Sequence, residues 1–211
     1  CTSFELFRRW VVSDKKILEL EKATKQTELQ QLKKQINPHF LFNMLNNANI
    51  LVKDAPDEAS QILEKLDNLL RYQLNDSTRR EVFLTADIQF LTSFLELEKV
   101  RRDHFEYTIF QEGNMENICI PPLLFIPFVE NAVKHNLDSD NLSYVHLYFS
   151  VHNKQLTFRC ENSKPRVPVK REGGIGLANV KRRLDLLYES RYTLQIEDKE
   201  TTYNVNLHLN L

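Results

Sequence analysis

Two groups of polar residues in this sequence have the types and spacing that phosphate chemistry requires. The first centres on His39, which follows Asn37 and Pro38 within a helical pattern. A neutral imidazole is a nucleophile near pH 7, and a proline directly before it starts or kinks a helix because proline lacks an N–H donor. The 3.6-residue period places His39, Asn43 and Asn46 on one polar helix edge. The alternative is that His39 is an ordinary surface histidine.

The second group lies on the helix predicted over 123–137. Glu130 and Lys134 are four residues apart, and Asn131 and His135 are four apart beside them. An amide oxygen suits Mg²⁺, which usually keeps several waters and bridges phosphates, and a lysine is a point charge for a phosphate. A plain i, i+4 surface pair is the alternative for Glu130 and Lys134, but it does not account for Asn131 and His135.

A glycine cluster supplies a third element. The chain has 4 glycines, and three of them, Gly173, Gly174 and Gly176, stand directly before a helical pattern. Free N–H groups and the positive dipole end of a helix bind anions, and glycine lets the backbone approach them closely. A basic loop, 164–172, precedes the cluster. A plain helix start is the alternative, but the three elements together indicate a nucleoside triphosphate with Mg²⁺.

Amphipathic helices dominate the first half of the chain. Residues 13–36 carry sparse apolar residues at near-heptad spacing, which favours a coiled-coil linker over a solvated single helix. Helices over 38–53 and 56–74 form a predicted antiparallel hairpin, and two hairpins make a four-helix bundle in a dimer. A further helix over 85–101 has Thr85 as its predicted N-cap. Asp87 is expected in its first turn, where a carboxylate favours the positive helix end.

The second half alternates strands with helices. Period-two patterns predict strands at 105–110, 145–151, 156–160, 192–196 and 203–211. Helices over 123–137 and 177–187 should cover one face of the sheet. The last strand carries one polar face, which we expect in water: Asn204, Asn206, His208 and Asn210. The fold class is therefore α+β, a helical hairpin followed by a two-layer α/β sandwich with an antiparallel-rich sheet.

Composition limits the function classes. The net charge of −1 argues against a nucleic-acid-binding surface. The three cysteines, Cys1, Cys119 and Cys160, lack metal-ligand spacing and fit a reducing compartment. No apolar run can span a bilayer, and the start at Cys1 indicates a fragment. Residues 4–12 suit either a segment leaving a membrane on its cytoplasmic side or the start of an amphipathic helix.

Three motifs, in order, carry a resemblance to one family. They are N-P-H-F-L-F-N at 37–43, P-P-L-L followed by V-E-N-A-V-K-H at 121–135, and G-I-G-L-A-N-V-K-R-R-L at 174–184. These strings resemble the phosphoacceptor box, the N-box and the glycine box of LytS/YehU-type sensor histidine kinases, and the likeness spans 29–211. It implies the GHKL-type ATPase fold shared with gyrase and MutL.

The resemblance also implies roles for individual residues. His39 would be the phosphoacceptor, and Asn131 would be the ligand of Mg²⁺. Lys134 and His135 would contact phosphates of ATP. The remaining nucleotide contacts would come from Asn162, Gly174, Gly176 and Leu177.

Two positions depart from the family pattern. Residues 162–164 read Asn-Ser-Lys where the superfamily has Asp-x-Gly-x-Gly, so the adenine contact would come from the weaker acceptor Asn162. Many histidine kinases have an acid directly after the phosphorylated histidine, and here that residue is Phe40. Asn43 can orient the imidazole but cannot take a proton. Glu130 is the candidate general base.

The implied protein is the cytoplasmic kinase core of a two-component sensor. The expected parts are a juxtamembrane linker (1–28), dimerisation and phosphotransfer helices (29–80) and an ATP-binding catalytic domain (81–211). As a protein-histidine kinase it would be a homodimer, would phosphorylate itself on His39 with ATP and Mg²⁺, and would pass the phosphoryl group to an aspartate of a response regulator. A missing N-terminal sensor would attach it to a bacterial inner membrane, and no nucleic acid is expected as a partner. The alternatives are a dimeric nucleotide-sensing pseudokinase scaffold and a purely structural bundle, which leaves the three motifs unexplained.

Overall fold

The computed structural model describes residues 38–136, 141–165 and 175–211, with side chains from Phe40 and, in the last segment, from Leu177. The predicted linker and coiled coil, most of the basic loop, Gly173 and Gly174 therefore lie outside the described residues. Among the described residues, no helix is both long and apolar enough to cross a lipid bilayer.

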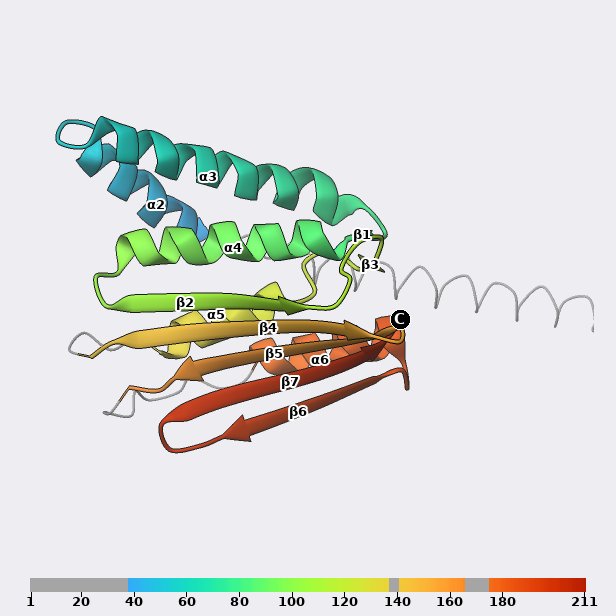
Figure 1. Ribbon diagram of the computed structural model, residues 1–211. Helices are drawn as coiled ribbons and strands as arrows, with labels where there is room; N and C mark the ends of the chain where they lie inside the picture. Colours follow the sequence, from blue (N-terminus) through green and yellow to red (C-terminus); the bar gives the residue numbers. More distant parts are fainter. Residues whose placement is uncertain (1–37, 137–140, 166–174) are drawn as a thin grey trace, which may run out of the picture. The chain divides into compact units, whose positions relative to one another are not determined.

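The first two helices form the predicted hairpin (Figure 1). Helix α2 is Pro38–Leu51 and α3 is Pro56–Asn75, so both predicted helices are confirmed to within two residues. Proline at the first helical position costs no hydrogen bond, and Asp57 and Glu58 favour the positive helix end. Each helix buries one apolar stripe: Phe40, Met44 and Ala48 on α2, and Ala59, Ile62, Leu66, Leu69 and Tyr72 on α3.

A short 3₁₀ turn, Asp76–Thr78, leads to the strand β1, Val82–Phe83, and then to α4, Leu84–Arg101. Strand β1 pairs with β3, Cys119–Ile120, in a two-stranded antiparallel sheet. The predicted N-cap, Thr85, is wrong: the helix starts one residue earlier, Phe83 is the N-cap residue, and no side chain caps it. Instead the N–H of Leu84 is satisfied by the carbonyl of Ile118 at 2.8 Å, across the small sheet.

The main sheet has five strands in the order β2-β4-β5-β7-β6. They are β2 (Phe105–Glu112), β4 (Ser143–His152), β5 (Gln155–Ser163), β6 (Tyr192–Asp198) and β7 (Thr202–Asn210). Only β2 and β4 are parallel, so the antiparallel-rich prediction is confirmed. A two-residue turn joins β4 to β5, and its residues Asn153 (φ 48°) and Lys154 (φ 63°) suit the twist of a hairpin.

Helices α5 (Ile126–His135) and α6 (Ile175–Tyr188) cover one face of this sheet (Figure 1). Phe125 lies at the centre of the aromatic core, with its ring 5.2 Å from Phe149 and 4.5 Å from Phe158. The inward residues of β4 are buried at every second position, as predicted: Val145, Leu147 and Phe149. Helix α4 packs beside α5 and β2, and α3 packs on α4, so the hairpin shares one core with the sheet.

Two predictions about local structure are wrong. The helix predicted from Leu123 begins only at Ile126, because Leu123 adopts φ 56°, which is left-handed and cannot continue a right-handed helix. Asn204 was expected in water on the polar face of the last strand, but only 3% of it is exposed. Its Oδ1 atom is buried without a hydrogen-bond partner among the described residues.

Candidate functional site

The edge of α5 carries all four residues of the predicted cluster. Burial of Phe128, Val129, Ala132 and Val133 fixes the rotation of the helix, and the ring of Phe128 lies 5.8 Å from Phe158 of β5. The opposite edge therefore presents Glu130, Asn131, Lys134 and His135, with Lys134 exposed and the other three half-buried. The helical spacing thus gathers these side chains as predicted. Their chemical roles are a separate question.

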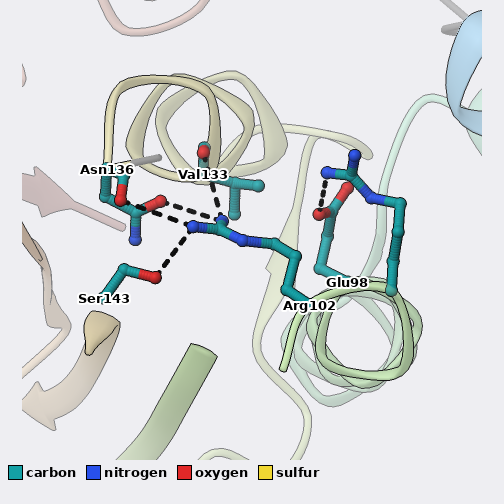
Figure 2. Close-up of polar contacts among 6 residues, drawn as sticks. Glu98, Arg102, Val133, Asn136 and Ser143 are labelled. Carbon is teal, nitrogen blue, oxygen red and sulfur yellow. Dashed lines mark hydrogen bonds and ion pairs between the residues drawn. The ribbon is translucent and has the colours of Figure 1, made fainter. Parts of the chain in front are cut away.

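Arg102 fixes the C-terminal end of α5 (Figure 2). Its guanidinium donates to Asn136 Oδ1 at 3.0 Å and to Ser143 Oγ at 2.8 Å. Longer contacts of 3.4 Å reach the carbonyls of Val133 and Asn136. A cation at the last carbonyls of a helix opposes the negative end of its dipole. The last turn of α5, which holds Lys134 and His135, is thereby attached to α4 and β4.

Asn136 and Arg102 were not predicted as site residues. Asn136 is fully buried at the C-cap of α5 and also donates to the carbonyl of Tyr144 at 3.1 Å. The guanidinium of Arg102 lies 4.6 Å from the ring centre of Phe105, and burial lowers the pKa of Arg102. Arg102 lies 34 residues from Asn136 and 41 residues from Ser143 in the sequence. No local sequence pattern could therefore indicate this cluster.

Glu130 faces a small pocket rather than Lys134. The pocket is lined by Phe40, Leu41, Leu69, Gln73, Phe94, Ile126 and Glu130. Burial, reinforced by the negative charge of Glu98, raises the pKa of Glu130 to about 7. Glu98 is itself buried on α4 and pairs with Arg101 at 2.6 Å (Figure 2). The described residues contain no ion pair between Glu130 and Lys134, so the plain surface pair is not what the fold forms.

The first turn of α2 borders the same pocket. Phe40 is buried, and its ring centre lies 4.9 Å from that of Phe94 on α4. Leu41 is half-buried beside it, and Asn43, one turn after His39, is also half-buried. The backbone of His39 belongs to this first turn, whereas its side chain lies outside the described residues. The fold therefore brings the start of α2 to Glu130, a meeting of segments about ninety residues apart in sequence.

The predicted adenine contact lies at the end of β5. Asn162 is buried and pairs in the sheet with Val145 and Tyr203. Its Nδ2 donates to the carbonyl of Ser163 at 2.7 Å. This bond uses the amide nitrogen and leaves the carbonyl oxygen of the side chain as the atom that can accept a hydrogen bond from a ligand.

The glycine box is only partly described. Gly174 lies outside the described residues, and Gly176 stands in the first turn of α6. Leu177 follows it and is half-buried. Helix α6 is held farther along by Arg183, which is buried and donates to the carbonyls of Pro122 and Leu123, the latter at 2.5 Å.

A second buried polar cluster was missed. Asp87 lies in the first turn of α4, as predicted. It is also fully buried, and it accepts from the hydroxyl of Tyr72 at 2.5 Å and from the N–H of Leu123 at 3.0 Å. A signal was present, because Asp87 shares the period of Leu91 and Phe94 and so occupies an apolar face. A carboxylate on such a face needs buried donors.

Comparison with known proteins shows which proteins the chain resembles. A family model described as histidine kinase matches residues 27–105. The sensor protein LytS of Staphylococcus haemolyticus is 30% identical over 203 residues, which cover 89% of this chain and 35% of that protein. The chain is a homologue of sensor histidine kinases over most of its length. It spans about a third of the length of that relative.

Other histidine kinases match the chain over different shares of its length. The sensor histidine kinase YpdA of Escherichia coli strain K12 is 31% identical over 119 residues, 56% of this chain and 21% of that protein. Among solved structures, the catalytic domain of histidine kinase ThkA has a TM-score of 0.47 at 16% identity, covering 62% of this chain and 93% of that one. The histidine kinase domain of an Erythrobacter litoralis blue-light activated kinase has a TM-score of 0.49 at 16% identity and covers 90% of this chain and 93% of that one.

Proposed function

We propose that this chain is the kinase core of a two-component sensor: it phosphorylates His39 with ATP and passes the phosphoryl group to an aspartate of a response regulator. The observation that carries the proposal is the pocket shared by Glu130 of α5 with Phe40 and Leu41 of α2. The element that would bear the acceptor and the helix that would hold the nucleotide meet there. The likeness to histidine kinases supports the same assignment.

The donor set fits Mg²⁺ bound together with ATP. The described residues contain no group of three or more His, Cys, Asp or Glu side chains that could hold a metal ion by itself. Mg²⁺ commonly takes one or two protein ligands and completes its shell with phosphate oxygens and water. The half-buried amide of Asn131 would be its protein ligand. When bound, Mg²⁺ neutralises charge on the phosphates.

The other nucleotide contacts follow from the positions of the residues. Lys134 and His135 would contact the phosphates from the same edge of α5. Gly174, Gly176 and Leu177 would close over the phosphates at the start of α6. Asn162 would accept a hydrogen bond from the adenine amino group through Oδ1, since its Nδ2 already donates to Ser163.

The phosphoryl transfer is an in-line displacement. One ring nitrogen of His39 attacks the γ-phosphorus, the bond from that phosphorus to the bridging oxygen breaks, and ADP leaves. The proton on the other ring nitrogen passes to Glu130, whose pKa of about 7 suits a base at neutral pH. Asn43, one helical turn from His39, orients the imidazole. The phosphoryl group then moves from the histidine nitrogen to a carboxylate oxygen of the response regulator.

The hairpin would also form the dimer interface. Residues 1–28 would be the linker, residues 29–80 the phosphotransfer region, and residues 81–211 the catalytic region. The two helices of the hairpin leave a second apolar stripe, exposed or half-buried, beside the buried one: Leu41 and Leu45 on α2, and Leu63, Leu70 and Leu74 on α3. Packing this stripe on a second copy would complete a four-helix bundle. The linker would connect the core to a membrane-bound sensor and would thus hold the core at the cytoplasmic side of a bacterial inner membrane.

Incubation with γ-³²P-labelled ATP and Mg²⁺ tests the proposal. Wild-type protein should acquire acid-labile label, and the label should be absent in His39→Gln and in Asn131→Asp. Addition of a response regulator should remove the label. Binding of nucleotide without any label would instead favour the pseudokinase scaffold, for which the neutral Asn162 and the absence of an acid at Phe40 are the specific observations.

A further inference from the structure

The buried cluster around Asp87 joins four separate segments of the chain. Tyr72 comes from α3, Asp87 from α4, Leu123 from the loop before α5, and Arg183 from α6. Asp87 and Arg183 are both buried, with 0% and 4% of their surfaces exposed. None of these contacts belongs to the nucleotide or phosphoacceptor residues described above. The cluster nevertheless connects α3, α4 and α6 with the loop that leads into α5, the helix that bears Glu130 and Asn131.

Leu123 is the point at which the cluster sets the direction of α5. Its φ of 56° is uncommon for a residue with a side chain and costs free energy. Both polar groups of its backbone are held, the N–H by Asp87 and the carbonyl by Arg183. Helix α5 begins three residues later, at Ile126. The turn, and with it the start of the helix bearing Glu130 and Asn131, is thus fixed by side chains of α4 and α6.

Tyr72 connects this turn to the hairpin. Its hydroxyl donates to Asp87 at 2.5 Å, and its ring stacks on Phe90 of α4 with centres 4.7 Å apart. Leu69 and Gln73, on the neighbouring turn of α3, line the pocket of Glu130. Asp87 Oδ1 accepts both hydrogen bonds, from the hydroxyl of Tyr72 and from the N–H of Leu123. Asp87 Oδ2 is buried and has no hydrogen-bond partner among the described residues.

We propose that Tyr72 and Asp87 are positioning residues: their hydrogen bond holds the hairpin of each chain on its own helix α5, in the arrangement from which His39 of that same chain is phosphorylated. The inference rests on the proposed function. It assigns a role to a contact far from the nucleotide. It predicts transfer within one chain because the pocket of Glu130 is lined by Phe40 and Leu41, the residues that follow His39 of that same chain.

The variant Tyr72→Phe separates positioning from nucleotide binding. It removes one hydroxyl and keeps the ring that stacks on Phe90. The bonds of Leu123 to Asp87 and Arg183 remain, so α5 keeps its start. The matched control is Tyr192→Phe, which removes an exposed tyrosine–carboxylate bond of similar length, to Asp185 at 2.6 Å, between β6 and α6.

The rate constant of autophosphorylation at saturating ATP gives the first readout. Tyr72→Phe should lower this rate constant about tenfold, the effect of losing one net hydrogen bond. The ATP concentration that gives half the maximal rate should stay within a factor of two, and Tyr192→Phe should match wild type in both quantities. Loss of ATP binding in Tyr72→Phe, or an unchanged rate constant, would overturn the assignment.

Hydrogen exchange gives a readout that does not require catalysis. Amides of α2 and α3 should exchange at least tenfold faster in Tyr72→Phe, whereas amides of β4, β5 and α5 should keep their protection. If wild-type protein acquires no label from ATP, the proposed function is refuted. The exchange experiment would still decide whether Tyr72 holds the hairpin. Unchanged exchange in α2 and α3 would refute the positioning role even in an active kinase.

Complementation tests whether transfer stays within one chain. The variants His39→Gln and Asn131→Asp are co-expressed so that mixed dimers form. In such a dimer one chain keeps the acceptor histidine and the other keeps the intact nucleotide site. Transfer within a chain predicts no label above that of either variant alone. A mixture of wild type with His39→Gln should be labelled and serves as the positive control. Recovery of label in the co-expressed variants would show transfer between chains and overturn this part of the proposal.

Discussion

The ring of Phe40 packs against the ring of Phe94 with their centres 4.9 Å apart, and only 7% of Phe40 is exposed. The residue directly after His39 is therefore part of the core between α2 and α4. A carboxylate at this position would be buried against an aromatic ring without a donor, which costs several kcal/mol, on the order of 2–7 for an unpaired polar group. The packing explains why an acid cannot occupy position 40 and why the base must come from another element.

Phe40→Ala should destabilise the protein by about 3–5 kcal/mol, because it leaves a cavity between α2 and α4. Urea unfolding followed by circular dichroism measures the loss. Phe42→Ala on the same helix is the control, because 68% of Phe42 is exposed, and it should change stability by less than about 0.5 kcal/mol. Equal effects of the two variants would contradict the docking of α2 on α4.

Glu130→Gln should lower the rate of autophosphorylation by about 10²-fold or more, because an amide cannot take the proton from His39. The dissociation constant for ATP should change little. Since the pKa of Glu130 is about 7, the wild-type rate should rise with pH through this value, and the variant should lose that step. Glu106→Gln, on the exposed side of β2, is the control. A variant with the wild-type rate would remove Glu130 as the base.

The raised pKa of Glu130 also predicts how stability depends on pH. The folded protein holds this proton up to about pH 7, whereas the unfolded chain releases it near pH 4.5. The folded state thus binds more protons between these values, so its stability falls as pH rises from about 4.5 to 7. The buried Asp87, with its pKa raised to about 6, acts in the same direction at lower pH.

Glu130→Gln should therefore be more stable than wild type at pH 8, by on the order of 1–2 kcal/mol after allowance for partial exposure. The difference in unfolding free energy between the two proteins should shrink as pH falls from 7 to 5. Chemical denaturation at pH 5, 6, 7 and 8 measures it. A difference that does not vary with pH would show that Glu130 titrates at its usual value in the folded protein.

Asn162→Asp should weaken ATP binding about fivefold to tenfold, although the wider superfamily has aspartate at this place. The Nδ2 of Asn162 donates to the carbonyl of Ser163, and a carboxylate would put an oxygen against that carbonyl instead. Titration with a fluorescent ATP analogue measures the affinity. Asn206→Asp, on the half-exposed face of β7, controls for the added charge. Tighter binding by Asn162→Asp would show that the amide donor is dispensable.

Arg102→Lys should loosen the last turn of α5, because lysine cannot reach Asn136 and Ser143 at the same time as a planar guanidinium does. The expected result is a several-fold higher KM for ATP and faster hydrogen exchange at the end of α5. Arg191→Lys is matched to it, since Arg191 also follows the C-terminus of a helix but is exposed. Its guanidinium donates to the carbonyl of Leu187 at 3.5 Å and lies 5.7 Å from the ring centre of Tyr188. The same behaviour in both variants would contradict a specific role for Arg102.

Local sequence patterns determined the elements and the faces within them. The 3.6-residue period alone puts Glu130, Asn131, Lys134 and His135 on one edge of α5, and the hairpin of α2 and α3 follows from two apolar stripes and Pro56. The strand pattern likewise predicted which residues of β4 point inward. These features depend on side chains a few residues apart, whose relative directions are set by helix and strand geometry.

Tertiary structure alone decided which distant groups share a desolvated environment. Asp87 lies in the first turn of α4 as expected, but the pattern did not predict its burial between Tyr72 and Leu123. Asn204 continues a polar alternation and is nevertheless buried. The pKa of Glu130 is raised because α2 and α4 cover it, not because of its neighbours in sequence. Burial and electrostatic interactions act through space, so their effect on a side chain depends on elements that no local pattern brings together.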